Sequence, residues 1–284
     1  MSIQEIRNAM YSAGVEPPAH IEIDGRLHRF DIGKKNKAGW YCFFLNPLAG
    51  AFGDWRQGVT HKFFARGGDT DPAALAAMKR AQAQRDKAKR KSASNAKRRA
   101  GIHWRESKPL YGMDHPYLRR KGVYPHGTRQ DRHGNLVVPV YVDGDIASLQ
   151  LIKPDGAKLF MRDGRTRGGY FRIGDDADAA LIAEGFATAA TLHEETGHCT
   201  YAAFNASNLT PVALWVSRQH PDAEITICGD NDHATEGNPG RVAAIKAARA
   251  IGARWTIPDF ANLVHGPKDT DFNDLARLTG EVQP

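Results

Sequence analysis

Acidic residues in the last third of the sequence follow short apolar segments that are typical of buried strands. Glu184 comes directly after "LIA", Asp230 and Asp232 follow "ITIC", and Asp269 and Asp271 lie in the loop after "WTIP". Ligands bind at the carboxyl ends of strands in an open parallel sheet, so we expect these carboxylates on one edge. Like charges at close quarters repel unless a cation neutralises them, and hard oxygen ligands suit Mg²⁺ or Mn²⁺. The spacing therefore predicts a divalent-metal site.

The sequence predicts where these carboxylates lie more closely than it predicts their roles. Any one of them could be a helix cap or a turn residue, Glu184 in particular. Metal ions held by Asp230 and Asp232, together with Asp269 and Asp271, would bridge phosphate oxygens and lower a barrier electrostatically. We predict Glu184, Asp230 and Asp232 as the catalytic residues, and Glu184 is either a metal ligand or a general base.

The elements that position these residues alternate between strands and helices. Short apolar strands are expected at 179–183, 200–204, 224–228 and 254–258. Helices of about ten residues are expected between them at 186–197, 210–221 and 240–252, and a last one at 271–280. This alternation predicts a parallel sheet covered on both faces, in a domain spanning residues 178–284.

The region before this domain, residues 109–177, has a different pattern. "HPYLRRKGV" predicts a short helix that ends at Gly122. The Asp143-Gly144 and Asp155-Gly156 pairs predict turns between successive antiparallel strands.

Residues 1–66 predict a small β-rich domain. A hairpin is expected around the Asp24-Gly25 turn, and glycine-marked aromatic strands follow it. The aromatic residues are expected in the core, with base stacking as the alternative for one or two of them. They are Trp40, Tyr41, Phe43, Phe44, Phe52 and Trp55.

Residues 67–108 predict a basic helical linker, which begins with Asp71 as N-cap and a proline in its first turn. From Lys79 to Lys108 the sequence holds twelve Lys or Arg against Asp86 and Glu106. Such a run is often only a solvated helix face, but it also fits a polyanion such as nucleic acid. The DNA-binding residues that we predict in it are Lys87, Lys89, Arg90, Lys91, Lys97, Arg98 and Arg99.

The overall composition narrows the class of protein. The chain has 284 residues, 41% of them hydrophobic and 25% charged, and a net charge of +7. No apolar run approaches the roughly 18 residues of a membrane span, and no signal core begins the sequence. We therefore expect no membrane association and a cytoplasmic location. Cys42, Cys199 and Cys228 lie far apart, which predicts neither a disulfide framework nor a zinc site.

Three motifs of the last domain resemble a known family. "LIAEGFATAATL", "ICGDND" and "KDTDFNDL" resemble, in order and spacing, the three motifs of the TOPRIM domain over about residues 178–280. Upstream, "HPYLRRKGV", "GNLVVPVYVDGDIASLQLI" and "GAKLFMRDG" are similar to the region before TOPRIM in DNA primases of plasmids and phages. The resemblance implies an α+β N-terminal part followed by an α/β TOPRIM domain with a Rossmann-like parallel sheet. It also implies synthesis of RNA primers on a single-stranded DNA template from NTPs with a divalent metal.

In such a primase, clustered basic residues would bind the triphosphate and the template backbone. The residues are Arg119, Arg120, Lys121, Lys158, Arg162, Arg165 and Arg167. The sequence also departs from the pattern, since Thr188 stands where chromosomal primases carry an aspartate, and the cysteine-rich zinc ribbon is absent. No GxxxxGK[ST] phosphate loop occurs in the sequence, so a replicative helicase would be a separate partner.

Two other functions fit the same motifs. A TOPRIM nuclease would use the acidic edge to hydrolyse phosphodiesters. A non-catalytic DNA-binding replication accessory protein would be basic and would carry a degenerate acidic site.

Overall fold

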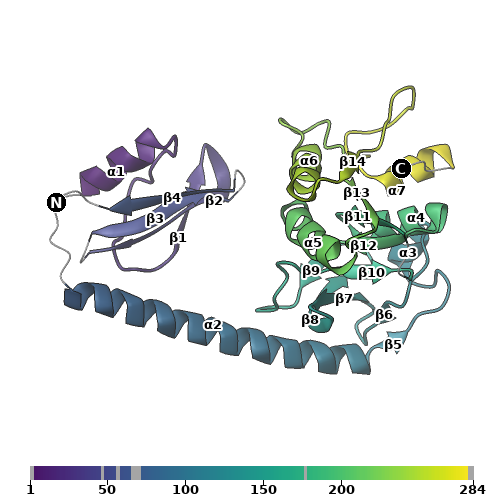
Figure 1. The fold of residues 1–284 in the computed structure, drawn as a ribbon, viewed down its shortest axis with the longest axis horizontal. Helices are drawn as coiled ribbons and strands as arrows, with labels where there is room; N and C mark the ends of the chain where they lie inside the picture. The colour runs from purple at the N-terminus through teal and green to yellow at the C-terminus, as the bar shows by residue number, and fades with distance from the viewer. Residues whose placement is uncertain (1–2, 46–47, 56–57, 65–71, 176–177, 281–284) are drawn as a thin grey trace. The chain divides into compact units, whose positions relative to one another are not determined.

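The computed structural model describes residues 3–45, 48–55, 58–64, 72–175 and 178–280, without the side chains of 34–36, 72–78 and 81. The chain forms two compact units, residues 1–88 and 89–284 (Figure 1). The boundary between them falls inside one helix, α2 (Pro72–Glu106). No helix in the described ranges combines the length and the apolar character that crossing a membrane requires.

The first unit is an antiparallel sheet with one helix. Its elements are α1 (Ile3–Ser12), β1 (His28–Ile32), β2 (Lys34–Phe44), β3 (Ala49–Asp54) and β4 (Val59–Phe64), and the strand order is β1-β2-β3-β4. Ile6 and Met10, one turn apart on α1, are fully buried and belong to the same core cluster as Tyr41, Phe43 and Phe52. Aromatic strands form as predicted, but the expectation that their aromatic residues are all in the core is wrong for Trp55, which is 55% exposed. Trp40 and Phe44 are half-buried.

The hairpin predicted around Asp24-Gly25 is wrong, because residues 24–26 form a bend and no strand precedes β1 in the described residues 3–27. The Asp24 carboxylate accepts hydrogen bonds from the Arg26 backbone N–H and from His28 Nε2, both at 2.8 Å. The Glu22 backbone N–H donates to the Tyr41 hydroxyl, and the Gly25 backbone N–H donates to the carbonyl of Phe43 at 2.8 Å. Single bonds to β2 thus hold this segment in place of a strand ladder.

Helix α2 runs without a break through most of the predicted helical linker, to Glu106. Ala96 and Ala100 on its second half are fully buried, and Ala100 clusters with Val137 and Leu149. Small side chains let a helix lie close to a sheet, so this part of α2 belongs to the core of the second unit. The predicted N-cap Asp71 lies outside the described residues.

The second unit begins with an antiparallel sheet, as predicted. Its elements are β5 (Lys108–Pro109), α3 (Pro116–Lys121), β6 (Arg129–Gln130), β7 (Leu136–Val142), β8 (Asp145–Ile152) and β9 (Lys158–Phe160), and the strand order is β5-β6-β7-β8-β9. Helix α3 ends at Gly122, whose φ of 68° is left-handed, as the sequence predicts.

An α/β layer completes the unit. Its elements are β10 (Phe171–Ile173), β11 (Ala179–Ala183), α4 (Phe186–Thr196), β12 (Cys199–Ala202), α5 (Ala206–Gln219), β13 (Glu224–Cys228), α6 (Pro239–Ile251), β14 (Arg254–Thr256) and α7 (Phe272–Thr279). The strand order is β10-β12-β11-β13-β14, parallel except for the edge strand β10. Helices α4 and α7 cover one face and α5 and α6 the other (Figure 1). The predicted fold class is confirmed, although the antiparallel edge strand is not foreseen.

Candidate active site at the carboxyl edge of the parallel sheet

The register of the two central strands brings the first acidic residues together. Ala183 at the end of β11 pairs with Cys228 at the end of β13. Glu184 and Asp230 therefore leave the sheet at nearly the same level on adjacent strands. The backbone N–H of Asp230 lies near enough to the Glu184 carboxylate to oppose the rise in its pKa that burial causes.

The loop after β13 holds Asp232 against the start of α6. The Gly240 backbone N–H donates to Asp232 Oδ2 at 2.9 Å, and the Asp232 backbone N–H donates to the Asn238 side chain at 2.9 Å. Gly240 has to be a glycine, because a Cβ there would lie 2.5 Å from the carbonyl oxygen of Asp230. Free backbone N–H groups at a helix start favour a negative charge, so this position suits an aspartate.

Asp271 reaches the same edge from the loop before α7. It is the N-cap of α7, and its Oδ1 accepts the backbone N–H of Asp274 at 2.8 Å in a capping box. The backbone N–H of Asn231 donates to the carbonyl of Thr270 at 2.7 Å, which ties this loop to the one after β13. The Thr188 hydroxyl also bonds to Asp271.

Burial and mutual repulsion make these acids hold protons unusually tightly. Burial, followed by the charge of Asp232, raises the pKa of Glu184 to about 7. Burial, followed by the charge of Glu184, raises the pKa of Asp230 well above its ordinary value. Burial also raises the pKa of Asp271, while the Lys121 ammonium opposes that rise. Groups that destabilise each other's charged forms in this way require a compensating cation or a proton.

Two carboxylate oxygens of the cluster are buried without a partner. Glu184 Oε1 and Asp230 Oδ1 have no hydrogen-bond partner among the described residues. An unsatisfied buried carboxylate oxygen is costly, and hard oxygen atoms of this kind are what Mg²⁺ and Mn²⁺ bind. The donor set at this edge therefore fits a divalent cation.

The fifth predicted acid behaves differently. Asp269 Oδ2 accepts the backbone N–H of Gly266 at 2.7 Å, within its own loop. Its carboxylate is used by a local turn, whereas Glu184, Asp230, Asp232 and Asp271 act on one another electrostatically.

Two lysines from the antiparallel half of the unit border the acidic edge. Lys121 Nζ lies 3.1 Å from Asp274 Oδ1 and 4.0 Å from Asp271 Oδ2. Much of the Lys158 side chain is exposed, but its ammonium group lies among protein atoms, 5.9 Å from the centre of the Tyr117 ring. Desolvation lowers the pKa of Lys158, and the carboxylates of Asp271 and Asp230 oppose that change. Both cations thus face the acids.

The other predicted basic residues of this half have different contacts. Arg119 Nη1 donates to the carbonyl of Asp114 and Arg120 Nη1 to that of Pro154, both at 3.0 Å. Arg165 lies 3.9 Å from Asp143. Arg162 and Arg167 are exposed in the same turn region.

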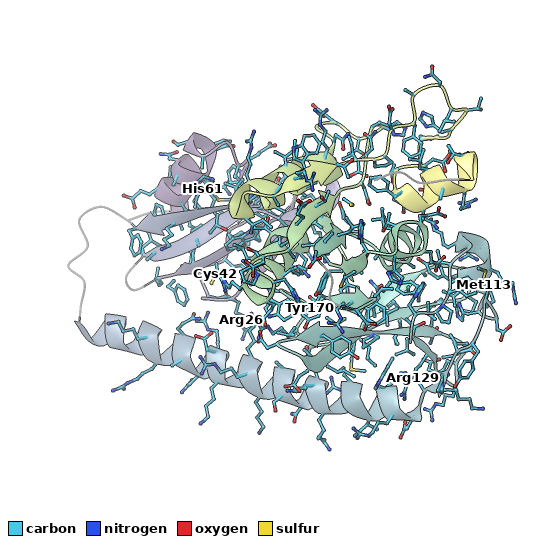
Figure 2. All side chains as sticks on the ribbon, turned by 45° about the vertical axis from the view of Figure 1, so that its right-hand side comes forward. Arg26, Cys42, His61, Met113, Arg129 and Tyr170 are labelled. Atoms are coloured by element: carbon cyan, nitrogen blue, oxygen red, sulfur yellow. The ribbon has the colours of Figure 1, made fainter. Side chains whose placement is uncertain are left out.

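The basic residues predicted on α2 fall into two groups. Lys97 pairs with Asp145 at 2.8 Å, and Arg99 donates to the carbonyl of Arg162 at 3.0 Å, so both anchor the helix to the second unit. The others are exposed, and Figure 2 shows side chains projecting from α2 along much of its length. They are Lys87, Lys89, Arg90, Lys91 and Arg98.

Sequence reasoning misses two residues of the site. Asp274 is buried on α7, and its Oδ1 forms ion pairs with Lys121 at 3.1 Å and with Arg277 at 3.6 Å. Its signal is the spacing of Asp271 and Asp274, which matches a capping box. Thr188 is noted in the sequence only as a departure, yet it is buried and bonds to Asp271.

A second group of ligand-type side chains lies in the first unit. The cluster consists of Glu22, Asp24 and His28, whose ligand atoms lie within 4.8 Å of one another. It is the only cluster of three or more such side chains among the described residues. They are largely exposed, and His28 already bonds directly to Asp24. No three of the described carboxylates at the sheet edge have ligand atoms within that distance of one another.

The fold and this acidic edge define a class of domain. Residues 179–281 match the family described as Toprim domain, and the resemblance in the motifs is thereby confirmed.

Two proteins called DNA primase TraC, both from Escherichia coli, are similar to most of this chain. One is 36% identical over 265 residues, which are 85% of this chain and 25% of the relative. The other is 32% identical over 287 residues, covering 91% of this chain and 20% of the relative. The chain thus spans a quarter or less of the curated relatives that it matches.

Among solved structures, the RNA polymerase domain of Mycobacterium tuberculosis primase DnaG is 18% identical, with 60% of each chain covered and a TM-score of 0.34.

Proposed function

We propose that this chain is a DNA primase that synthesises short RNA primers on single-stranded DNA by metal-dependent nucleotidyl transfer. The observation that carries the proposal is the pair of buried, unpartnered oxygens of Glu184 and Asp230, beside Asp232 and Asp271. Similarity to two proteins named DNA primase over most of the chain supports the choice of reaction.

In this proposal Glu184, Asp230, Asp232 and Asp271 hold Mg²⁺ or Mn²⁺. The bound metal would supply positive charge to phosphate oxygens as the new bond forms. The chain's own contribution is to keep four carboxylates at one edge in spite of their repulsion. The strand register fixes Glu184 and Asp230, the start of α6 fixes Asp232, and the α7 capping box fixes Asp271.

In this proposal the ammonium groups of Lys158 and Lys121 bind the triphosphate of the incoming NTP. Both ammonium groups interact with the acidic edge from the neighbouring antiparallel half, so an NTP held there would meet cations on one side and metal on the other. Charge-assisted contacts to phosphate are strong and directional, which suits the task of orienting the α-phosphate for attack.

The single-stranded template is held by the exposed basic residues, a class of contact that is independent of base sequence. On α2 these are Lys87, Lys89, Arg90, Lys91 and Arg98, and beyond β9 they are Arg162, Arg165 and Arg167. A replicative helicase would act as a separate partner, and a cytoplasmic location remains part of the proposal.

The deciding experiment incubates the protein with single-stranded DNA, labelled NTPs and Mg²⁺ or Mn²⁺, and resolves the products on a gel. Short labelled oligomers whose length and yield depend on the template would support synthesis. A shortened template without new oligomers would support the nuclease instead. Binding without either product would mean that the chain is an accessory protein and would overturn the proposal.

A further inference from the structure

Helix α1 covers one face of the first unit's sheet, and Arg85 of α2 reaches over part of the other, which we call the open face. Tyr41, Phe43 and Phe52 point toward α1 and are buried. Since side chains alternate along strands, the residues between them point the other way. The pairing of neighbouring strands places Arg29 of β1, Trp40 of β2, Gly53 of β3 and Thr60 of β4 in one row across this open face.

The glycine in that row makes room for a flat aromatic surface. A Cβ on Gly53 would lie 3.0 Å from Nε1 of Trp40, so the indole lies across the glycine. The Trp55 ring packs beside it, with ring centres 5.2 Å apart and an angle of 31° between the planes. Trp55 remains 55% exposed, and Phe64 at the other end of the face is 69% exposed. Large exposed aromatic groups on one face are typical of an interaction surface.

The charges on this face are mainly positive. Arg29 lies beside Trp40, Lys62 occupies the next row, and Arg85 of α2 lies 5.2 Å from the centre of the Phe44 ring. Asp31 on β1 is engaged locally, because its carboxylate accepts the backbone N–H of Lys37 at 2.6 Å. A polyanion would meet three cations spread along the rows of aromatic residues.

We propose that this open face is a stacking surface for single-stranded DNA, with Trp40 and Trp55 as its centre. Unpaired bases present flat rings that stack on aromatic side chains, while cations alongside receive the phosphates. A duplex hides its bases, so it would lose the stacking part of the interaction. The proposal rests on the proposed function in one respect only, the choice of single-stranded DNA as the polyanion.

The test measures binding of a fluorescent oligothymidine by anisotropy, with the full chain, a chelator and no NTPs. Trp55→Ala should weaken binding about tenfold, the usual scale for losing one base–aromatic stack, and Trp55→Phe should restore most of it. Tyr11→Ala is the matched control, because Tyr11 is 59% exposed on α1, which packs against the opposite face. It should leave the affinity unchanged.

Two further measurements separate this idea from its rivals. A duplex of the same length should bind the wild type and Trp55→Ala alike. If Trp55→Ala keeps wild-type affinity for the oligothymidine, the face serves another partner, such as a protein, and the proposal is overturned. Equal losses for single strand and duplex would overturn it too.

This outcome is independent of catalysis. The binding assay contains neither metal nor NTP, so it measures the open face separately from the acidic edge. Failure of primer synthesis with intact, Trp55-dependent binding would count against the proposed reaction alone.

Discussion

Lys121 Nζ lies 3.1 Å from Oδ1 of Asp274, a residue 153 positions later in the chain. The contact joins the end of α3 to the start of α7, and the Lys121 backbone carbonyl also accepts a hydrogen bond from Asn273 at 2.7 Å. Asp271, on the same turn of α7, belongs to the acidic edge. The antiparallel half and the Toprim domain thus share one site.

Because of this contact, replacing Lys121 should reduce primer synthesis more than replacing the nearby Arg119. Lys121→Ala should lower primer synthesis by roughly ten- to a hundredfold, because hydrogen bonds to charged groups contribute about 1.5 to 3 kcal/mol. Arg119→Ala, two residues away and bonded to the Asp114 carbonyl, should have a slight effect. Steady-state synthesis with each variant measures the difference. Equal losses would mean that the basic cluster acts as a unit, and full activity of Lys121→Ala would remove its NTP-binding role.

The raised pKa values predict how stability depends on pH when no metal is present. The pKa of Glu184 lies at about 7 in the folded chain, above its ordinary value of 4.5, so the folded state binds protons more tightly than the unfolded state. The free energy of unfolding should therefore fall as pH rises from about 5 to 8, by an amount on the order of 1 kcal/mol.

Urea unfolding in a chelator at several pH values measures this slope. Glu184→Gln should flatten it, and so should Mg²⁺, which neutralises the carboxylates at high pH. A slope that neither change affects would place its origin elsewhere in the protein.

The two groups of basic residues on α2 predict different phenotypes. Replacing Lys89, Arg90, Lys91 and Arg98 with glutamine should weaken binding to single-stranded DNA without lowering the melting temperature. Each lost phosphate contact should reduce the slope of log K against log salt by roughly 0.7. Lys97→Gln should instead affect mainly stability, because Lys97 pairs with Asp145. An unchanged salt slope for the fourfold variant would show that this part of α2 is only a solvated helix.

Much of the α/β layer could be predicted from the sequence, because its strands are short apolar runs and its helices end at glycines such as Gly197 and Gly252. The motif order also places Glu184, Asp230 and Asp271 at one edge, since parallel strands present their carboxyl ends together. These inferences need only local patterns and one topological rule.

What could not be predicted depends on contacts between distant segments. The full length of α2 depends on Ala96 and Ala100, whose burial only the folded sheet reveals. In place of the strand expected before Asp24, that segment makes single hydrogen bonds to Tyr41 and Phe43 of β2. The pairing of Lys121 with Asp274, and the approach of Thr188 to Asp271, join segments far apart in the chain, and no local spacing encodes them.

The acidic residues themselves are predicted to differ in importance. Asp271→Asn should reduce synthesis far more than Asp269→Asn, because Asp271 is coupled to Glu184 and Asp230, whereas Asp269 closes a local turn. The Mg²⁺ concentration needed for half-maximal synthesis measures this. Equal effects would return Asp269 to the set of metal ligands.

The most direct test of the central claim is the rate of primer synthesis by Asp230→Asn as Mg²⁺ is varied, beside Asp259→Asn as a control. Asp259 is an exposed residue whose carboxylate accepts the backbone N–H of Ala261 at 2.8 Å. The metal-site account predicts that Asp230→Asn loses synthesis by a factor of at least about a hundred at every Mg²⁺ concentration while melting cooperatively, and that Asp259→Asn behaves like the wild type. Near-normal synthesis by a folded Asp230→Asn at low Mg²⁺ would contradict it.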